Sequence, residues 1–412
     1  MGKLFGTDGV RGVFNEELTV ELAYQLGRFG SHVLSEGSHN PKIVIGKDTR
    51  ISGDPLEKAL TEGIVSVGGD VILAGVIKFF SGDGYKLSDV VENNIESFIL
   101  EKKEVESHPT GTVTVLEHPE KIYLEHITKD FDCDFSGLKM VLDCAHGASY
   151  SIAPEFFVNG GAEVVTIGNK PDGKNINAGC GSTCLNVLCD AVVKEQADIG
   201  IAFDGDADRC LVVDEKGEIV DGDKLLHLIG VKMKKEGRLK KDTVVVTVMS
   251  NIGLDIALEK SDCKTIKTAV GDRYVLEEML NNGYNLGGEQ SGHVILLDHN
   301  TTGDGMLTAL VFLTLLKEDG RLASELSALM TSYPQVLVNA KVSNDKKKAY
   351  LSDEVIQLKI SEVEKHFDGQ GRVLIRPSGT EPLVRVMIEG KNQDELDEIA
   401  HDLANLIEER LV

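Results

Sequence analysis

The stretch that decides the fold is Ile199-Gly200-Ile201-Ala202-Phe203-Asp204-Gly205-Asp206-Ala207-Asp208-Arg209. Its first five residues are apolar and read as a buried strand, and three carboxylates alternate with small residues directly after it. In α/β sheets the loops that follow the carboxyl ends of strands carry the chemistry. Three carboxylates at every second position can converge on one cation, and an oxygen-only set suits Mg²⁺ or Ca²⁺ better than zinc.

Two other interpretations of residues 204–209 stay open. A run of charges in a turn is often only a solvated acidic surface, although the Gly residue and the strand-end position favour a ligand site. Glu215 also lies where the twelfth ligand of an EF-hand loop would lie. Arg209 takes the place that such a loop reserves for Gly, and both flanks read as strands, so an EF-hand is disfavoured.

Similar apolar runs recur along the chain and alternate with amphipathic stretches, at residues 42–46, 71–74, 140–143, 164–167 and 244–248. Strands that alternate with helices predict an α/β protein with parallel or mixed sheets. After residue 333 the pattern changes to strands at 336–342, 372–375 and 383–388 and helices at 353–367 and 393–411, which predicts an α+β unit. We expect domains at 1–110, 111–220, 221–333 and 334–412 around a central cleft.

The charge balance limits the partners of the protein. The 412 residues carry a formal net charge of −24, which repels nucleic acid and anionic membranes, so we expect neither as a partner. Any phosphate site must therefore be locally basic. The odd number of seven cysteines, without a C-x-x-C pair, and the absence of an apolar signal region predict reduced thiols in the cytoplasm.

A second constellation is Gly287-Gly288-Glu289-Gln290-Ser291-Gly292-His293. Its Gly residues let backbone approach a ligand closely. Glu289, Ser291 and His293 offer a carboxylate, a hydroxyl and an imidazole, a set that suits sugar hydroxyls or an amine. A tight turn with a histidine satisfied inside the core is the alternative interpretation.

A third constellation is Arg376-Pro377-Ser378-Gly379-Thr380-Glu381-Pro382, with Arg385 beyond it. Guanidinium groups, hydroxyls and backbone N–H groups of a Gly turn are what a phosphate dianion binds. An ordinary loop between two strands is the alternative, but the loop concentrates positive charge in an acidic protein.

Three weaker motifs complete the set, at residues 5–12, 46–50 and 270–274. The first two could be simple turns or ion pairs. The third opens a helix, so its N-terminus could hold an anion, or Asp272 could simply cap the helix.

Together and in this order, these loops resemble those of the α-D-phosphohexomutase superfamily. Within it, the sugar loop with Glu289 and His293 and the opening Thr7-Asp8-Gly9-Val10-Arg11 resemble the phosphoglucosamine mutase forms. The resemblance implies four domains and an isomerase that interconverts glucosamine 6-phosphate and glucosamine 1-phosphate for amino-sugar and cell-wall precursors. It also implies a phosphoserine enzyme and a bisphosphorylated intermediate.

The resemblance assigns roles to residues of this chain. It implies Mg²⁺ on Asp204, Asp206 and Asp208 beside Arg209, and a hexosamine 1,6-bisphosphate as primer, in a monomer or homodimer. It implies sugar contacts from Glu289, Ser291 and His293, phosphate contacts from Arg376, Ser378, Gly379, Thr380 and Arg385, and cleft positions for Thr7, Arg11, Asp272 and Arg273.

The chain departs from the family at residues 77 and 78. Family members continue from a strand like residues 71–77 through a helix and a strand into a loop with the nucleophilic serine. Here residue 77 passes directly to Lys78, the residue that resembles the family lysine near that serine. About 30 residues, the size of a βαβ increment, are missing, so we expect a reduced first domain in which residues 68–80 form one fused or kinked strand. A non-catalytic sugar-phosphate binder or regulatory protein is therefore an alternative function, and a mutase of glucose or mannose phosphates is another.

Ser38-His39-Asn40-Pro41 matches the last four residues of the family's nucleophilic serine loop. It precedes a strand, whereas the family motif follows one. This places residues 38–41 at the opposite edge of the sheet from residues 204–209, here called the metal loop. A polar helix-to-strand connection is therefore the favoured interpretation of residues 38–41.

Overall fold

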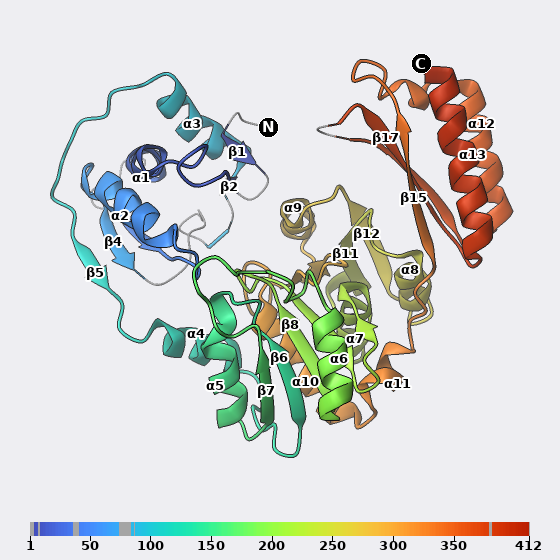
Figure 1. Ribbon diagram of the computed structural model, residues 1–412, viewed down its shortest axis with the longest axis horizontal. Helices are drawn as coiled ribbons and strands as arrows, with labels where there is room; N and C mark the ends of the chain where they lie inside the picture. Colours follow the sequence, from blue (N-terminus) through green and yellow to red (C-terminus); the bar gives the residue numbers. More distant parts are fainter. Residues whose placement is uncertain are drawn as a thin grey trace.

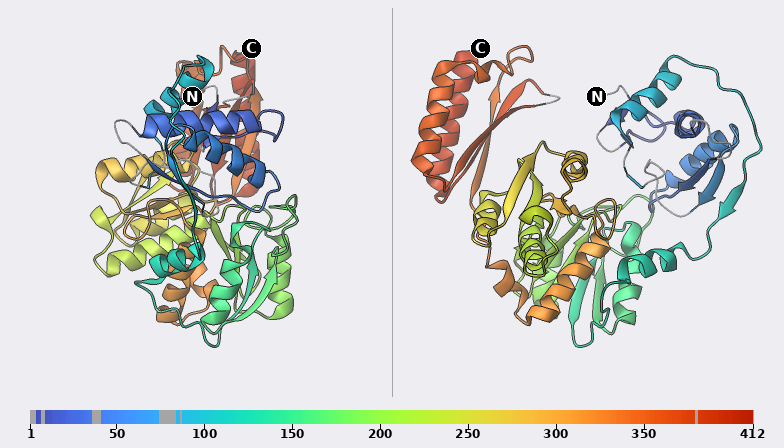
Figure 2. Two further views of the ribbon diagram at one scale, coloured as in Figure 1. Left: turned by 90° about the vertical axis from the view of Figure 1, so that its left-hand side faces the viewer. Right: turned by 180° about the vertical axis from the view of Figure 1, so that it is seen from behind.

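The structure, a computed structural model, describes residues 4–6, 9–35, 41–73, 84–85, 87–378 and 381–411. Its sheets form four units in chain order. The first unit (blue) and the fourth (red) lie on the same side of a body built from the second and third (Figure 1), as the rear view also shows (Figure 2). Three α/β units and a C-terminal α+β unit confirm the predicted fold class. The boundaries at residues 110, 220 and 333 and the central cleft stay predictions.

The first unit holds a parallel sheet in the order β3-β4-β5 and a short β1-β2 ribbon. Its elements are β1 (Phe5–Gly6), β2 (Gly9–Val10), α1 (Val20–Leu34), β3 (Lys42–Ile45), α2 (Gly53–Val65), β4 (Asp70–Leu73), α3 (Asp89–Leu100) and β5 (Val113–Val115). Helices α1 and α2 pack at backbone contact, because a Cβ on Gly27 would lie only 2.3 Å from the Leu60 carbonyl oxygen.

Among the described residues this sheet has three strands, with β5 at one edge. Strand β5 pairs only with β4 among the described residues. Val113 and Val115 share the face of the buried Val71, yet they are 50% and 68% exposed. The reduced first domain stays a prediction, with which the three strands of the described residues agree. The expected fused or kinked strand is wrong at its start, because Gly68 has a left-handed backbone (φ 87°) and β4 begins at Asp70; its continuation over residues 74–80 lies outside the described residues.

The second unit is a mixed sheet in the order β10-β9-β8-β6-β7. Its elements are α4 (Pro119–Thr128), β6 (Lys139–Asp143), η1 (Ala148–Tyr150), α5 (Ile152–Asn159), β7 (Glu163–Ile167), α6 (Asn186–Glu195), β8 (Ile199–Phe203), β9 (Cys210–Asp214) and β10 (Ile219–Val220). Strands β7, β6 and β8 run parallel, and β8 and β9 form an antiparallel hairpin that is buried throughout. This hairpin places residues 204–209 at one end of the sheet.

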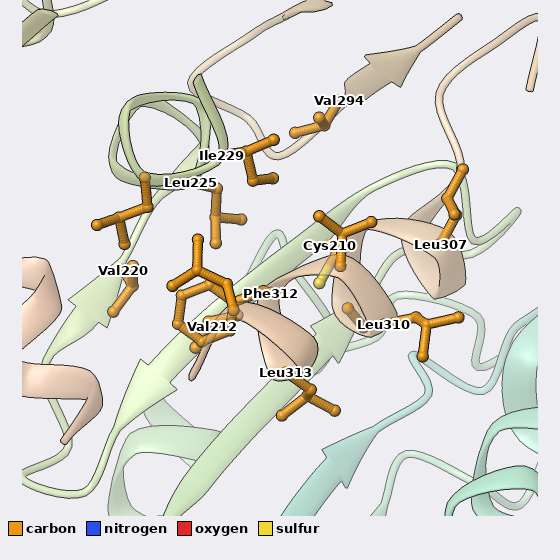
Figure 3. Close-up of a cluster of buried hydrophobic side chains, with 14 of the residues drawn as sticks. Cys210, Val212, Val220, Leu225, Ile229, Val294, Leu307, Leu310, Phe312 and Leu313 are labelled. Carbon is orange, nitrogen blue, oxygen red and sulfur yellow. The ribbon is translucent and has the colours of Figure 1, made fainter. Parts of the chain in front are cut away.

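The third unit is a sheet in the order β12-β11-β13-β14. Its elements are α7 (Gly222–Lys235), η2 (Lys240–Asp242), β11 (Thr243–Thr247), α8 (Ile252–Glu259), β12 (Lys264–Thr268), α9 (Asp272–Asn282), β13 (Leu286–Gly288), β14 (Val294–Leu296), α10 (Gly305–Asp319) and α11 (Ala323–Ser327). Helix α10 is apolar on nearly every side, so it lies inside one core shared by the second and third units. Figure 3 shows Phe312 of α10 beside Val212 of β9, and Leu310 of α10 on the side of Cys210. None of the helices in the described ranges is long and apolar enough to cross a membrane.

The fourth unit is an antiparallel sheet in the order β15-β17-β16 covered by two helices. Its elements are β15 (Gln335–Lys341), η3 (Ala349–Leu351), α12 (Glu354–Phe367), β16 (Arg372–Pro377), β17 (Leu383–Glu389) and α13 (Gln393–Leu411). The Asn251 side chain holds the start of this unit, because it donates to the Tyr333 carbonyl and accepts the Tyr333 N–H, each at 2.9 Å. Arg372 bonds the Ser250 carbonyl (2.7 Å) and the buried Glu389 carboxylate.

A buried histidine in α7 predicts a pH dependence of stability. Burial, and then repulsion by Lys260, lowers the pKa of His227 to about 4. In the unfolded chain the imidazole of His227 binds a proton near pH 6.5, whereas in the folded chain it stays neutral until about pH 4. Protonation therefore favours the unfolded chain: the free energy of unfolding is unaffected above pH 6.5 and decreases as the pH falls toward 4. We expect about 2 kcal/mol of the free energy of unfolding to be lost through His227 between pH 7 and 5. Urea unfolding at both pH values should show a shallower loss for His227→Phe; equal losses would contradict the prediction.

Candidate active site

The turn between β8 and β9 brings three carboxylates together. One ligand oxygen each of Asp204, Asp206 and Asp208 lies within 4.8 Å of the others. Ala207 adopts a left-handed backbone (φ 60°), and its N–H donates to the Asp204 carbonyl at 3.2 Å. The flanking strands exclude an EF-hand, which needs helices.

Three carboxylates concentrate negative charge in this turn. Asp204 is only 7% exposed, so it is not a solvated acidic turn residue. Burial, and then the charges of Asp208 and Asp206, raise the pKa of Asp204 to about 8. The Arg209 Nε lies 3.9 Å from both Asp204 and Asp208 and, within the described ranges, has no hydrogen-bond partner. Three carboxylate oxygens this close together fit a hard divalent cation such as Mg²⁺.

Residues 289–293 form the turn between β13 and β14 and pack against the end of the metal loop, residues 204–209. The Cys210 N–H donates to the Gly292 carbonyl at 3.0 Å. A Cβ on Gly292 would lie 2.4 Å from the Cys210 carbonyl oxygen, so glycine is required there. The Ser291 hydroxyl has no hydrogen-bond partner in the part of the chain that the structure describes. It is therefore available to a ligand.

His293 lies between two carboxylates from different loops. Its Nδ1 is 3.6 Å from Asp208 of the metal loop, and its Nε2 is 3.3 Å from Asp272 at the start of α9. The side chain is 2% exposed. His293 thus lies between the metal loop and α9, although its Nε2 forms no hydrogen bond within the described residues, and its burial limits direct contact with a sugar.

A carboxylate of the protein binds the N-terminus of α9. The Gly271 N–H donates to the Glu289 carboxylate at 3.1 Å, so Glu289 is the anion at this helix end. Arg273, one residue into the helix, pairs with Asp89 (2.7 Å) and Glu92 (3.2 Å) of α3. The arginine assigned to the cleft by resemblance therefore joins the first and third units.

Two arginines lie opposite each other on neighbouring strands at the phosphate loop of the fourth unit. Arg376 and Arg385 are cross-strand partners in β16 and β17. Like charges directly opposite one another are unfavourable, and burial together with Arg385 lowers the pKa of Arg376. A dianion between them would relieve this repulsion. Ser378 is buried, its hydroxyl accepts the Glu381 N–H at 3.1 Å, and Gly379 and Thr380 lie outside the described residues.

Four family models match the chain in order. Phosphoglucomutase/phosphomannomutase α/β/α domains I, II and III match residues 2–77, 121–217 and 221–333, and the C-terminal domain of the same family matches residues 337–406. The phosphoglucosamine mutase of Alkaliphilus metalliredigens is 51% identical over 447 aligned positions, which cover 100% of both chains. The chain belongs to the phosphoglucosamine mutase family. The phosphoglucosamine mutases of Alkaliphilus oremlandii and Clostridium novyi are each 53% identical, with 100% and 99% of the relative covered.

Solved structures of the wider superfamily share this fold. A phosphoglucomutase/phosphomannomutase family protein of Burkholderia thailandensis has a TM-score of 0.82 at 21% identity and covers 99% of this chain and 98% of its own. The N-acetylphosphoglucosamine mutase of Aspergillus fumigatus, in complex with GlcNAc-6P and magnesium, has a TM-score of 0.72 at 19% identity, with 100% and 96% covered.

The comparison with phosphoglucosamine mutases also exposes an internal gap. The alignment with the Alkaliphilus metalliredigens relative spans 447 positions and this chain has 412 residues, so at least 35 positions have no counterpart here. The match to domain I ends at residue 77. Both observations agree with a segment missing after residue 77.

The remaining predicted residues divide into two groups. Arg11 is described and is exposed just after β2. Thr7 and Lys78 lie outside the described residues, as do Ser38, His39 and Asn40. The structure thus brings the metal loop, the sugar loop and Asp272 into contact, whereas the phosphate loop belongs to the separate fourth unit (Figure 1).

The sequence reasoning gave no site role to Arg50, which belongs to the weak motif at residues 46–50, and it missed Lys347. Arg50 lies close enough to Asp206 for that charge to raise the Arg50 pKa, although the Asp48 hydrogen bond is the main cause. The Thr49 hydroxyl beside it donates to the His146 carbonyl at 2.6 Å. Lys347 is buried and donates to the Ser378 carbonyl at 2.7 Å. Arg50 follows a strand end, which was a usable signal, but Lys347 lies in a run of three lysines that reads as solvated surface.

Proposed function

We propose that this chain binds a hexosamine phosphate and Mg²⁺ at a phosphoglucosamine mutase site, for the interconversion of glucosamine 6-phosphate and glucosamine 1-phosphate. The observation that carries the proposal is the contact of the metal loop with the sugar loop through His293. Relatives at 51–53% identity are phosphoglucosamine mutases, which favours the glucosamine phosphates over glucose or mannose phosphates.

Each group has a role in this proposal. Arg376 and Arg385 hold the phosphate that does not react, and Ser378 shapes the loop around it. Ser291 meets the sugar, and Glu289 meets it from the N-terminus of α9. His293 holds Asp208 in position from the Asp272 side. Mg²⁺ on Asp204, Asp206 and Asp208 would offset charge on the transferring phosphoryl group.

The serine that carries the phosphoryl group in the family route is missing with the internal segment, so the chain alone binds substrate but turns it over slowly. A hexosamine 1,6-bisphosphate is the expected primer. We extend the proposal to the cytoplasm, which the seven free cysteines support. A monomer or a homodimer stays a prediction.

Calorimetry with glucosamine 6-phosphate and Mg²⁺ tests the binding. We expect Arg376→Ala and Arg385→Ala each to weaken sugar-phosphate affinity about 10- to 100-fold, because each removes a charge-assisted hydrogen bond. Arg410→Ala, which removes an exposed ion pair with Asp353 in the same unit, is the matched control and should leave affinity unchanged. Unchanged affinity in both loop variants would refute the assigned phosphate site.

A mutase assay with the bisphosphate primer tests the chemistry. Turnover should lie roughly 10³-fold or more below that of the Alkaliphilus metalliredigens relative, since the covalent nucleophile is missing. Turnover equal to that of the relative would mean that another group of this chain carries the phosphoryl group.

A further inference from the structure

Residues 342–350 support the phosphate loop, residues 376–382, from within the fourth unit. A hydrogen bond reaches into this loop, where the Lys347 ammonium group donates to the Ser378 carbonyl at 2.7 Å. Two further bonds hold the loop near its ends, from the Val342 N–H to the Pro382 carbonyl (3.1 Å) and from the Tyr350 hydroxyl to the Ile375 carbonyl (3.0 Å). The segment therefore fixes the loop near both ends and at a point between them.

Lys347 is the buried member of a run of three lysines. Lys346 and Lys348 are exposed, whereas Lys347 is only 8% exposed. Within the described residues no carboxylate forms an ion pair with Lys347, and the Ser378 carbonyl is its hydrogen-bond acceptor. A buried ammonium group without a counter-charge lowers stability. Groups that cost stability in this way are typical of functional sites, so Lys347 suits a place where an anion binds.

The ammonium group acts on a peptide group of the phosphate loop. The carbonyl of Ser378 belongs to the same peptide group as the N–H of Gly379, which the resemblance assigns to the phosphate. A cation on the carbonyl oxygen polarises this peptide group, and its N–H becomes a stronger donor to an anion. Ser378 is also fixed on its other sides, because its hydroxyl accepts the Glu381 N–H (3.1 Å) and its N–H donates to the Leu383 carbonyl (2.9 Å).

We propose that Lys347 is a positioning residue of the phosphate site. It holds the main chain of the phosphate loop at Ser378 in the form that binds the phosphate dianion of the substrate, and it strengthens the backbone donor of the same peptide group. Its charge adds to those of Arg376 and Arg385 at a loop that must attract an anion to a chain of net charge −24. The inference deepens the proposed function and rests on it.

Calorimetry of the full chain with glucosamine 6-phosphate tests this role. Lys347→Met keeps most of the side-chain length and removes the charge, so we expect the affinity to fall about 10-fold or more. Lys347→Arg keeps the charge and should stay within about 3-fold of the unmodified chain. Lys348→Met makes the same charge change at an exposed neighbour and is the matched control, with an expected change below about 2-fold.

Thermal unfolding without ligand separates positioning from simple structural support. Removal of a buried charge that has no counter-charge should leave the midpoint of Lys347→Met equal or higher, although its affinity falls. A lower midpoint, or a loss of affinity that Lys347→Arg does not restore, would overturn the proposal. Lys347→Gln, which keeps a hydrogen-bond donor without the charge, decides the question if Lys347→Met does not fold: unchanged affinity in Lys347→Gln would also overturn it.

Inorganic phosphate separates this proposal from the proposed function, because it needs no sugar loop. We expect inorganic phosphate to raise the unfolding midpoint of the unmodified chain more than that of Lys347→Met. Equal increases would overturn the role of Lys347 and leave the proposed function standing. The expected difference in a chain that does not bind glucosamine 6-phosphate would overturn the proposed function and support Lys347. An unmodified chain that responds to neither ligand would overturn both.

Discussion

Replacing Asp206 with Asn lowers the Mg²⁺ affinity of the protein by about 100-fold or more. Removal of groups that merely orient metal ligands already weakens metal affinity 10- to 100-fold in metalloproteins, and Asp206 is one of three carboxylates whose oxygens lie within 4.8 Å of one another. Calorimetric titration with Mg²⁺ measures the effect. Asp190→Asn, an exposed carboxylate on α6 of the same unit, is the matched control and should bind Mg²⁺ like the unmodified chain.

The same substitution should raise stability when metal is withheld. Three close carboxylates repel one another, and the charge of Asp206 is one of the causes that raise the pKa of Asp204. Thermal unfolding in a chelator should therefore give an equal or higher midpoint for Asp206→Asn. A lower midpoint together with unchanged Mg²⁺ affinity would mean that the turn is structural and holds no metal.

Replacing Arg372 with Met should cost about 3–5 kcal/mol of the free energy that holds the fourth unit in place. Arg372 pairs with Glu389, whose side chain is 0% exposed, and bonds the Ser250 carbonyl of the third unit at 2.7 Å. Without Arg372 the hydrogen bonds left to the buried carboxylate among the described residues come from the Ile252 N–H (3.3 Å) and the Gln335 amide (3.2 Å). Urea unfolding measures the loss.

Two variants give this prediction its controls. Arg410→Met removes an exposed ion pair of the same type from the same unit, and such pairs contribute about 0–1 kcal/mol. The double variant Arg372→Met with Glu389→Gln removes both charges and should recover part of the loss, because no unpaired charge stays buried. Equal losses for Arg372→Met and Arg410→Met would show that the buried pair does not stabilise the domain contact.

The metal loop could be predicted from the sequence because its geometry is local. A buried strand, an alternation of Asp with small residues and a second strand are enough to bring Asp204, Asp206 and Asp208 together. The strand pattern and the switch after residue 333 predicted the fold class for the same reason: periodicity reports on burial within each element.

The environment of the other residues depends on contacts between distant segments. His293 is assigned to the sugar by resemblance, but docking of the β13-β14 turn buries it between Asp208 and Asp272. Arg273 meets carboxylates of α3, about 180 positions earlier in the chain. Lys347 is buried because the fourth unit folds its loop over Ser378. No local pattern encodes these contacts.

Within the described residues, the edge strand β5 is a liability for this chain in the cell. An uncovered strand with exposed valines, such as β5 with Val113 and Val115, is a template for pairing with other extended segments. Chaperones and proteases act on surfaces of this kind, and small differences in stability there change cellular abundance several-fold. The steady-state amount of the protein would thus be set at β5, far from the carboxylates that define its chemistry.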